Sequence, residues 1–246
     1  GTTTIDAGTL EIGGAGQLGS GSYAGTIANN GILNYNSSAN QTLSGVISGS
    51  GELLKENTST LTLSGTNTYA GGTRIEGGTV EIQNSAALGT GLVNLAETGT
   101  KVLDFGADGL TLANSVQISN QAGTRTIRLD SGGAGHTGTL SGQLDIRRDT
   151  AGEFVVDVGN TDELLVTSAI VTNSGGGAGL TKEGDGLLRI EVNSSYAGNT
   201  VINGGTLRIR NVYGSRAWSP GTININNGSA LEFTGNGSQT IMQGAG

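Results

Sequence analysis

Residues 61–80 read LTLSGTNTYAGGTRIEGGTV, and the fold of the chain can be inferred from them. Leu61 and Leu63 alternate with threonines, so their side chains point to one face of a short strand. A polar turn follows, and the alternation then resumes. Gly77 and Gly78 turn the chain sharply, because glycine adopts positive φ without steric cost. The pattern predicts strands of about five residues joined by turns of small residues.

The pattern recurs near both ends of the chain. Three segments align from residues 1, 71 and 198, and they read GTTTIDAGTLEIGG, GGTRIEGGTVEIQN and GNTVINGGTLRIRN. The alignment superimposes Ile5, Ile75 and Ile202, which lie far apart in the chain. Upstream, LLKENTSTLTL (53–63) corresponds to LTKEGDGLLRI (180–190). Self-similarity over such long separations is typical of coils stacked on one another.

We therefore expect an all-β solenoid, a parallel β-helix, over residues 1–246, with a further, truncated repeat at 211–246. Strands wound into coils pair in parallel with the strand one coil away. Hairpin dipeptides, which a sandwich or barrel would need, are scarce. Each coil should take roughly 20–25 residues. The predicted core contains aliphatic residues: Ile5, Leu10, Ile12, Leu61, Leu63, Ile75, Val80, Ile82, Ile190, Val192, Ile202, Leu207 and Ile209.

Composition limits the classes of function. Only 13% of the residues are charged, and 12 Lys and Arg against 20 Asp and Glu give a formal net charge of −8. Nucleic-acid binding needs clustered basic side chains, so we expect no nucleic-acid partner. No run approaches the ~20 apolar residues of a membrane helix, and we expect no signal peptide. The chain has no Cys, which excludes a thiolate metal site and a cysteine nucleophile.

Residues 61–80 closely resemble the autotransporter-associated β-strand repeat of passenger domains in type V secreted proteins. That motif reads roughly TLTLSGxNTYxGGTxIxGGTL. Residues 188–207 are a more degenerate match, and residues 3–10 match its tail. Matches to the motif are frequent over residues 1–91 and 176–210 and less frequent between these two segments. The resemblance implies a right-handed, single-stranded parallel β-helix.

The resemblance also implies export through the outer membrane and display at the cell surface by the protein's own outer-membrane barrel. We expect that barrel to lie outside this chain, because aromatic residues make up only 4% of it. Repeat units are interrupted at Gly1 and Gly246, so we expect the chain to be part of a longer passenger. The implied function is a non-catalytic structural and adhesive stalk. Its partner would be a host or bacterial surface protein or glycan.

The sequence contains no evident catalytic constellation or cofactor motif. His136, the single histidine, lies in a glycine-rich turn, where solvent exposure is more common than catalysis. The glycine-rich runs at 13–16 and 132–135 lack the Asp of calcium-binding nonapeptides. A Gly-x-Gly-x-x-Gly match at 14–19 is not followed by a helical pattern. We expect no cofactor, no metal site and no enzymatic activity.

Residues 119–175 form divergent, charge-rich coils. Departures from a repeat tend to be loops or faces that contact partners. The simpler interpretation is extra coils whose charged side chains, Arg125 among them, face solvent and form local ion pairs. The candidate contact residues are Asp145, Arg147, Arg148, Asp149 and, in a second place, Trp218.

Two other functions stay open. One is a glycan-binding or polysaccharide-degrading β-helix with a carboxylate-containing groove near residues 119–175. It predicts two or more carboxylates and an Arg on one face of a parallel sheet. The other is a rod that self-associates through its charged or Asn/Thr-rich faces.

Overall fold

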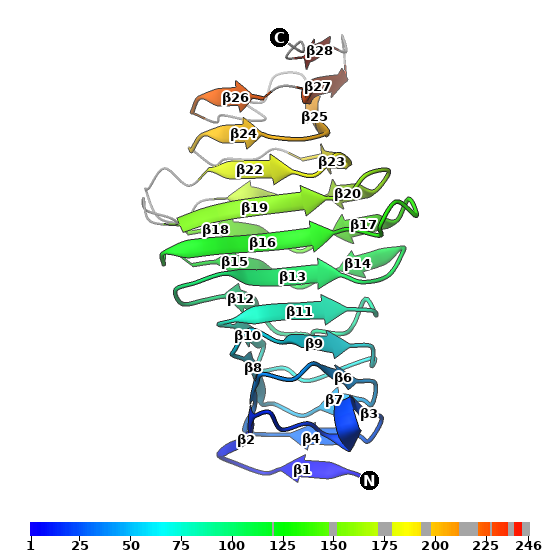
Figure 1. The fold of residues 1–246 in the computed structure, drawn as a ribbon, viewed down its shortest axis with the longest axis vertical. Coiled ribbons are helices and arrows are strands. Elements are labelled where there is room, and N and C mark those ends of the chain that lie inside the picture. The colour runs from blue at the N-terminus through cyan, green and yellow to red at the C-terminus, as the bar shows by residue number, and fades with distance from the viewer. Residues whose placement is uncertain are drawn as a thin grey trace.

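The computed structural model describes residues 1–119, 121–147, 152–171, 179–192, 198–211, 221–226, 228–235 and 239–242. The chain winds into an elongated stack of coils, with β1 at one end and β28 at the other (Figure 1). A short 3-10 turn, η1 (Gly19–Gly21), is the only helical element in the described ranges. None of the helical structure there is long and apolar enough to cross a membrane.

Four sheets run along the stack, and we number them in the order in which they appear. Sheet 1 contains β1 (Thr3–Ile5), β4 (Ile27–Asn29) and β7 (Ile47–Ser48). Sheet 2 contains β2 (Thr9–Gly14), β5 (Ile32–Ser37), β8 (Glu52–Lys55), β10 (Thr73–Ile75), β12 (Val93–Leu95), β15 (Val116–Ile118), β18 (Leu144–Ile146) and β21 (Ile170–Val171).

Sheet 3 is the longest sheet, and sheet 4 begins further along the chain, at β14. Sheet 3 contains β3 (Ser22–Tyr23), β6 (Gln41–Leu43), β9 (Thr60–Leu63), β11 (Gly78–Ile82), β13 (Lys101–Phe105), β16 (Gly123–Leu129), β19 (Gly152–Val158), β22 (Leu180–Glu183), β24 (Thr200–Ile202) and β26 (Ile223–Ile225). Sheet 4 contains β14 (Leu110–Leu112), β17 (Thr137–Leu140), β20 (Glu163–Val166), β23 (Leu187–Ile190), β25 (Thr206–Asn211), β27 (Ala230–Gly235) and β28 (Gln239–Met242).

The strand pairing confirms the predicted parallel solenoid. Each strand pairs in parallel with strands one coil away, except for the antiparallel pair β27–β28. Leu61 lies beside Val80 on the next coil, and Ile127 lies beside Val156. More residues separate Ile127 from Val156 along the chain than separate Leu61 from Val80, so the length of a coil varies more than expected. The longer of these two coils falls within 119–175.

The three copies of the motif lie on different sides of the stack. Along the chain, a strand of sheet 2 is followed by one of sheet 3, and a strand of sheet 4 then precedes the next strand of sheet 2. In the first coils, sheet 1 takes the place of sheet 4 in this order. Each coil therefore has three sides. The first copy places β1 and β2 on sheets 1 and 2, and the second places β10 and β11 on sheets 2 and 3. The third places β24 and β25 on sheets 3 and 4. Each copy is thus displaced by one side from the copy before it.

The core is the predicted aliphatic stack. Ile75, Val80 and Ile202 are each 0% exposed. Burying an aliphatic side chain of this size stabilises a fold by about 1.5–3 kcal/mol. Two predicted core residues, Leu10 and Val192, are only half-buried and pack against the edge of the core.

One side of the stack has no strand between β9 and β10, and a buried asparagine links the coils there. The Asn67 Oδ1 atom accepts a hydrogen bond from the Ile47 N–H at 2.7 Å, and its Nδ2 donates to the Ala87 carbonyl at 2.6 Å. The side chain therefore joins the coil before it to the coil after it. Tyr69 is fully buried beside it, its hydroxyl 2.5 Å from Thr73 Oγ1, and burial raises its pKa.

Glycines allow neighbouring coils to approach closely at two corners. A Cβ on Gly45 would lie 2.1 Å from the Gly25 carbonyl oxygen, and one on Gly65 would lie 2.4 Å from the Gly45 oxygen. At the second corner, Gly51 stands in the same relation to Gly31, at 2.2 Å. Stacked glycines are required here because any side chain would collide with backbone.

Among the residues that the structure describes, four cationic side chains are buried inside the stack, which corrects one expectation. Arg125, predicted to face solvent, is 0% exposed, and its guanidinium donates to the Glu97, Gln121 and Gly123 carbonyls. The lysines Lys55, Lys101 and Lys182 are also 0% exposed. Isolated buried charge is costly unless it is hydrogen-bonded, and here backbone carbonyls supply the acceptors.

Candidate binding site

Two of the predicted contact residues lie at β18. Asp145 is only 6% exposed, and its Oδ2 accepts a hydrogen bond from Arg147 Nε at 2.6 Å. The side-chain amide of Gln117, which is in register with Asp145, lies within 3.1 Å of the same guanidinium. Asp145 Oδ1 has no hydrogen-bond partner among the residues that the structure describes. The other predicted residues, Arg148, Asp149 and Trp218, lie outside the described ranges.

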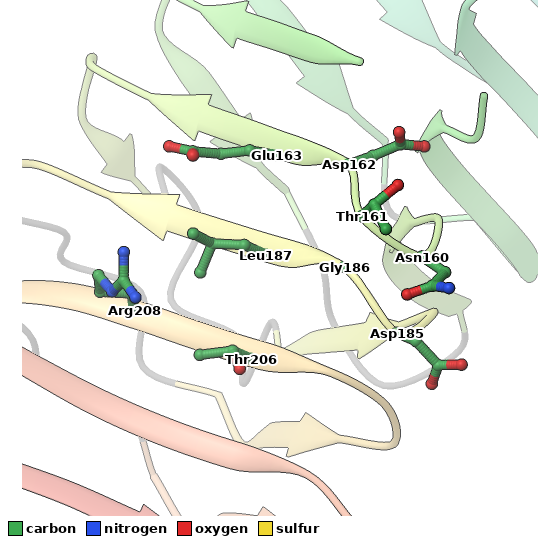
Figure 2. A pocket seen from close by; sticks show the side chains of 9 residues that line it. All are labelled: Asn160, Thr161, Asp162, Glu163, Asp185, Gly186, Leu187, Thr206 and Arg208. Carbon is green, nitrogen blue, oxygen red and sulfur yellow. The ribbon is translucent and has the colours of Figure 1, made fainter. Parts of the chain in front are cut away.

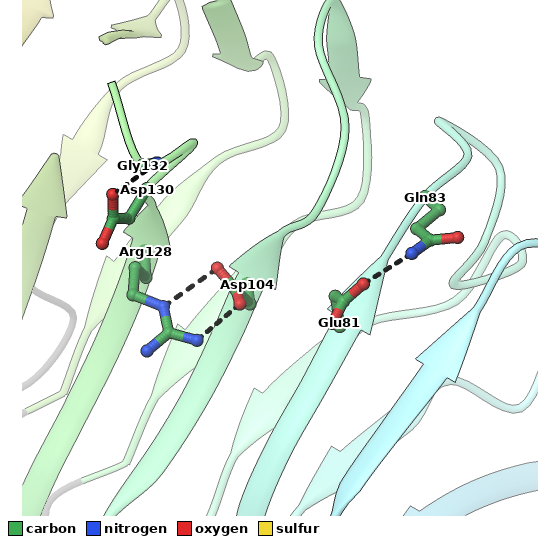
Figure 3. Close-up of polar contacts among 6 residues, drawn as sticks. All are labelled: Glu81, Gln83, Asp104, Arg128, Asp130 and Gly132. Carbon is green, nitrogen blue, oxygen red and sulfur yellow. Dashed lines mark hydrogen bonds and ion pairs between the residues drawn. The ribbon is translucent and has the colours of Figure 1, made fainter. Parts of the chain in front are cut away.

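A column of charged side chains runs along the outside of sheet 3. Register places Glu81, Asp104, Arg128, Asp157 and Glu183 side by side on five successive strands. Arg128 donates from Nε and Nη2 to the two oxygens of Asp104, at 3.1 and 2.6 Å (Figure 3). These bonds raise the pKa of Arg128, and burial raises the pKa of Asp157. This column has the carboxylates and the Arg that the groove hypothesis requires, on a sheet face.

A pocket of about 350 Å³ lies where the turns between sheets 3 and 4 meet the first residues of sheet 4. Figure 2 shows that three successive coils line it. The turn before β20 supplies Asn160, Thr161 and Asp162, and β20 itself supplies Glu163. The next coil supplies Asp185, Gly186 and Leu187, and β25 supplies Thr206 and Arg208. Glu163, Leu187 and Thr206 are neighbours in register, so they stand in one row.

Asp162 fixes one wall of the pocket. It is 1% exposed, and its Oδ1 accepts hydrogen bonds from the Ser131 hydroxyl at 2.5 Å and the His136 N–H at 2.7 Å. Its Oδ2 accepts from the Ser131 N–H at 2.8 Å. The turn before β20 is thereby tied to the loop of the preceding coil. Since these acceptors are satisfied within the protein, Asp162 shapes the pocket and leaves ligand contacts to its neighbours.

Thr161, in the same wall, has a strained backbone. Its φ is 68°, in the left-handed region that β-branched residues rarely adopt. Such strain persists only where surrounding structure imposes it, and it clusters at functional sites. The strain therefore marks Thr161 as a candidate part of a functional site.

Ion pairs hold two other charged groups of the pocket. Glu163 Oε1 lies 3.1 Å from Arg189 Nη1, and Arg208 Nε donates to Glu232 Oε2 at 2.6 Å. Asp185 is exposed and forms no hydrogen bond or ion pair within the described ranges. The arrangement offers hydrogen-bond donors and acceptors around Leu187. Across the described residues, no three His, Asp or Glu side chains are arranged to hold a metal ion.

From the sequence, Asp162 with Glu163 is one of the candidate carboxylate pairs for a sugar-cleaving site, but the pocket residues as a set were not predicted. They come from segments on three successive coils, and only the coil register brings them together. The one available signal was the Asp162–Glu163 pair, which is part of the charge-rich region. Its meaning depends on the 131–136 loop, whose position in space the sequence pattern does not give.

The comparisons with known proteins agree with the motif. The family model described as passenger-associated-transport-repeat matches residues 1–12, 53–82 and 180–209. The chain is similar to a protein named "Adhesin BmaC autotransporter" from Brucella suis biovar 1 (strain 1330), with 31% identity over 210 residues. That match covers 82% of this chain and 5% of the relative. No solved structure matches the chain significantly.

The matched segments are those that form β1–β2, β8–β11 and β22–β25, so family motif and coil structure coincide. A passenger of this kind is exported and exposed at the cell surface. Motif, solenoid and relative together identify the chain as an autotransporter passenger sequence with passenger-associated transport repeats.

Proposed function

We propose that the chain is a non-catalytic stalk of a surface adhesin, with a contact surface on its side. The observation that supports this most is the unbroken stacking of sheet 3, whose ten strands run from β3 to β26. Coils of a solenoid contact mainly their neighbours, so each added coil lengthens the rod and exposes more lateral surface. The adhesin name of the relative, of which the chain spans 5%, supports the adhesive role.

The proposed contact surface belongs to the divergent coils at 119–175. Arg147 supports it, because its side chain is 47% exposed, and the nearly buried Asp145 holds its guanidinium in place. Arg148, Asp149 and, further along, Trp218 complete the proposed contact residues. The partner class is a surface protein or glycan of a host or bacterial cell. Self-association of two rods is the other arrangement that the test separates.

Bead adhesion tests this function. Beads coated with the chain should adhere to cultured animal cells or to bacterial cells, whereas beads coated with a non-adhesive protein of similar net charge should not. Self-association would instead make the coated beads aggregate with one another. The same preparation should release no reducing ends from a panel of polysaccharides. Absence of adhesion to every surface, or release of sugar, would contradict the proposal.

A polysaccharide-degrading function is the second candidate, because Asp104, Arg128 and Asp157 stand together on sheet 3. Burial raises the pKa of Asp157, as a general acid requires. If this candidate were correct, cleavage would be detected and Asp157→Asn would abolish it, whereas Asp6→Asn, an exposed aspartate in the first coil, would leave it unchanged.

A further inference from the structure

The pocket between the three coils has a donor and acceptor pattern that fits one class of ligand. Asp185 supplies a carboxylate, which accepts hydrogen bonds only, and the terminal nitrogens of Arg208 supply donors. Thr161 and Thr206 supply hydroxyls, which both donate and accept. A ligand that satisfies all of them must itself present both hydrogen-bond donors and acceptors. Hydroxyl groups on neighbouring carbons have that property.

Most of these polar groups are available to a ligand. Arg208 uses its Nε for Glu232, and no other partner of its guanidinium occurs in the described part of the chain. Asp185, Thr161 and the Thr206 hydroxyl form no hydrogen bonds with other described side chains or backbone groups. Leu187 is half-buried between them and gives the pocket an apolar surface. A few polar groups placed around an apolar surface are typical of small-molecule sites.

The charge of the pocket disfavours an acidic ligand. Three carboxylates, those of Asp162, Glu163 and Asp185, line it together with one guanidinium. Glu163 pairs with Arg189, and the Arg208 guanidinium already pairs with Glu232, so an anion would meet the uncompensated negative charge of Asp162 and Asp185. Sugars that bear carboxylate or sulfate groups are therefore disfavoured.

The wall of the pocket is fixed before any ligand binds. Leu187 N–H donates to the Asp162 carbonyl at 2.9 Å, and Thr206 N–H donates to the Gly186 carbonyl at 3.1 Å. Gly186 itself must lack a side chain, because a Cβ would lie 2.1 Å from the Gly159 oxygen. A preformed site loses little conformational entropy on binding, which favours affinity for a small unit.

We propose that this pocket binds one uncharged sugar unit of a surface glycan, with Asp185, Thr206 and Arg208 as its hydrogen-bonding residues. The inference rests on the proposed adhesive function and names the ligand class of one site. The glycan comes from either a host cell or a bacterial envelope, since the two share the same hydroxyl chemistry.

Two glycan arrays test the inference, one of animal-cell glycans and one of bacterial polysaccharides. The labelled chain should bind neutral glycans on one of them, and the array that responds identifies the source. Titration of the corresponding soluble oligosaccharide should then show that Asp185→Ala and Thr206→Val each weaken binding by about tenfold or more, as expected for loss of a hydrogen bond to a charged or well-placed group.

The matched control is Asp6→Ala, which removes an exposed aspartate at the far end of the stack and should bind like the wild type. Circular dichroism should be unchanged in all three variants, because none of the removed groups has a hydrogen-bond partner within the described residues. The melting temperature should fall slightly for Asp185→Ala alone, because that substitution removes a carboxylate that attracts the buried Lys182 ammonium. Binding to neither array, or equal affinity of Asp185→Ala, Thr206→Val and Asp6→Ala, would overturn the inference. If coated beads still adhere to cells in that case, the adhesive function stands and only this ligand assignment fails.

Discussion

At the residue scale, the lysines have an internal role. Lys55 donates through Nζ to the carbonyls of Glu56 and Asn57 and, one coil on, of Gly77 at 3.3 Å. Lys182 in the third motif copy contacts the equivalent carbonyls of residues 183, 184 and 204. Each ammonium therefore closes a corner and joins two coils. Desolvation lowers the pKa of both lysines to about 8, against the attraction of nearby carboxylates.

Amine-reactive labelling should be blocked in the native protein. The sequence contains three lysines, and Lys55, Lys101 and Lys182 are all 0% exposed. We expect an N-hydroxysuccinimide ester at pH 8 to label only the amino group of Gly1, which is exposed. The denatured chain should take four labels, three on lysines and one at the terminus. Intact-mass spectrometry counts them.

The lowered lysine pKa values make this a strict test. Near pH 8 a substantial fraction of each ε-amine is uncharged and chemically reactive, so only burial can protect it. Denatured protein is the control for intrinsic reactivity. Labelling of Lys55 or Lys182 at the rate of the denatured chain would show that the corner is open in solution.

Burial of these cations was not predictable from composition or periodicity. Charged residues are almost never fully buried unless paired, so Arg125 was expected to face solvent. The sequence nevertheless contained a signal, because Lys55 and Lys182 occupy the same position in two motif copies. A charged residue that recurs beside a glycine-rich corner has backbone carbonyls within reach. Arg125 has no such counterpart in the motif, so its burial follows only from the structure.

At the element scale, the corners depend on glycine. Gly25, Gly45 and Gly65 lie on successive coils, and each carbonyl occupies the space that the next Cβ would need. Gly45→Ala should therefore destabilise the protein by about 1–3 kcal/mol, the usual cost of overpacking. The Cβ would lie 2.1 Å from the Gly25 oxygen, and backbone cannot move aside as a flexible side chain can. Urea unfolding followed by circular dichroism measures the change.

Gly13→Ala is the matched control. Its Cβ would meet only the end of the exposed Glu11 side chain, at 2.7 Å, which can rotate away. We expect no loss of stability there, or a small gain from reduced flexibility of the unfolded chain. Equal destabilisation by the two substitutions would mean that close coil stacking at Gly45 is not the cause.

The strands themselves were largely predictable, whereas their placement around the coil was not. Alternation identified β9 and β11 because Leu61, Leu63, Val80 and Ile82 repeat at period two, and all four are 0% exposed. The alignment did not predict that each motif copy lies one side further round the stack. That placement depends on the lengths of all intervening coils, and the coils of the divergent region are long. The pocket was not predicted for the same reason, because its residues are brought together only by the register of successive coils.

At the scale of the whole molecule, the stack is held together by contacts between neighbouring coils. Nearly all pairing joins a strand to the coils directly before and after it. Stability of such a rod is close to a sum of terms for each coil and each interface. A local defect should therefore open a local region and leave distant coils folded. A rod of this kind can be weakened at one point without losing a contact site elsewhere on its side.

Hydrogen exchange of Gly45→Ala tests this independence. The substitution lies beside the bonds Ser44 N–H to Tyr23 carbonyl and Ile27 N–H to Val46 carbonyl, at 3.0 and 2.9 Å. We expect amide protection to fall in the strands around that corner, β4, β6, β7 and β9. Amides of β16 and β19, several coils away, should keep wild-type protection. Exchange monitored by mass spectrometry on peptic fragments resolves the two regions, with Gly13→Ala as the control for the substitution itself. An equal loss of protection along the entire chain would show that the coils unfold as one cooperative unit, which the nearest-neighbour contacts of this stack do not predict.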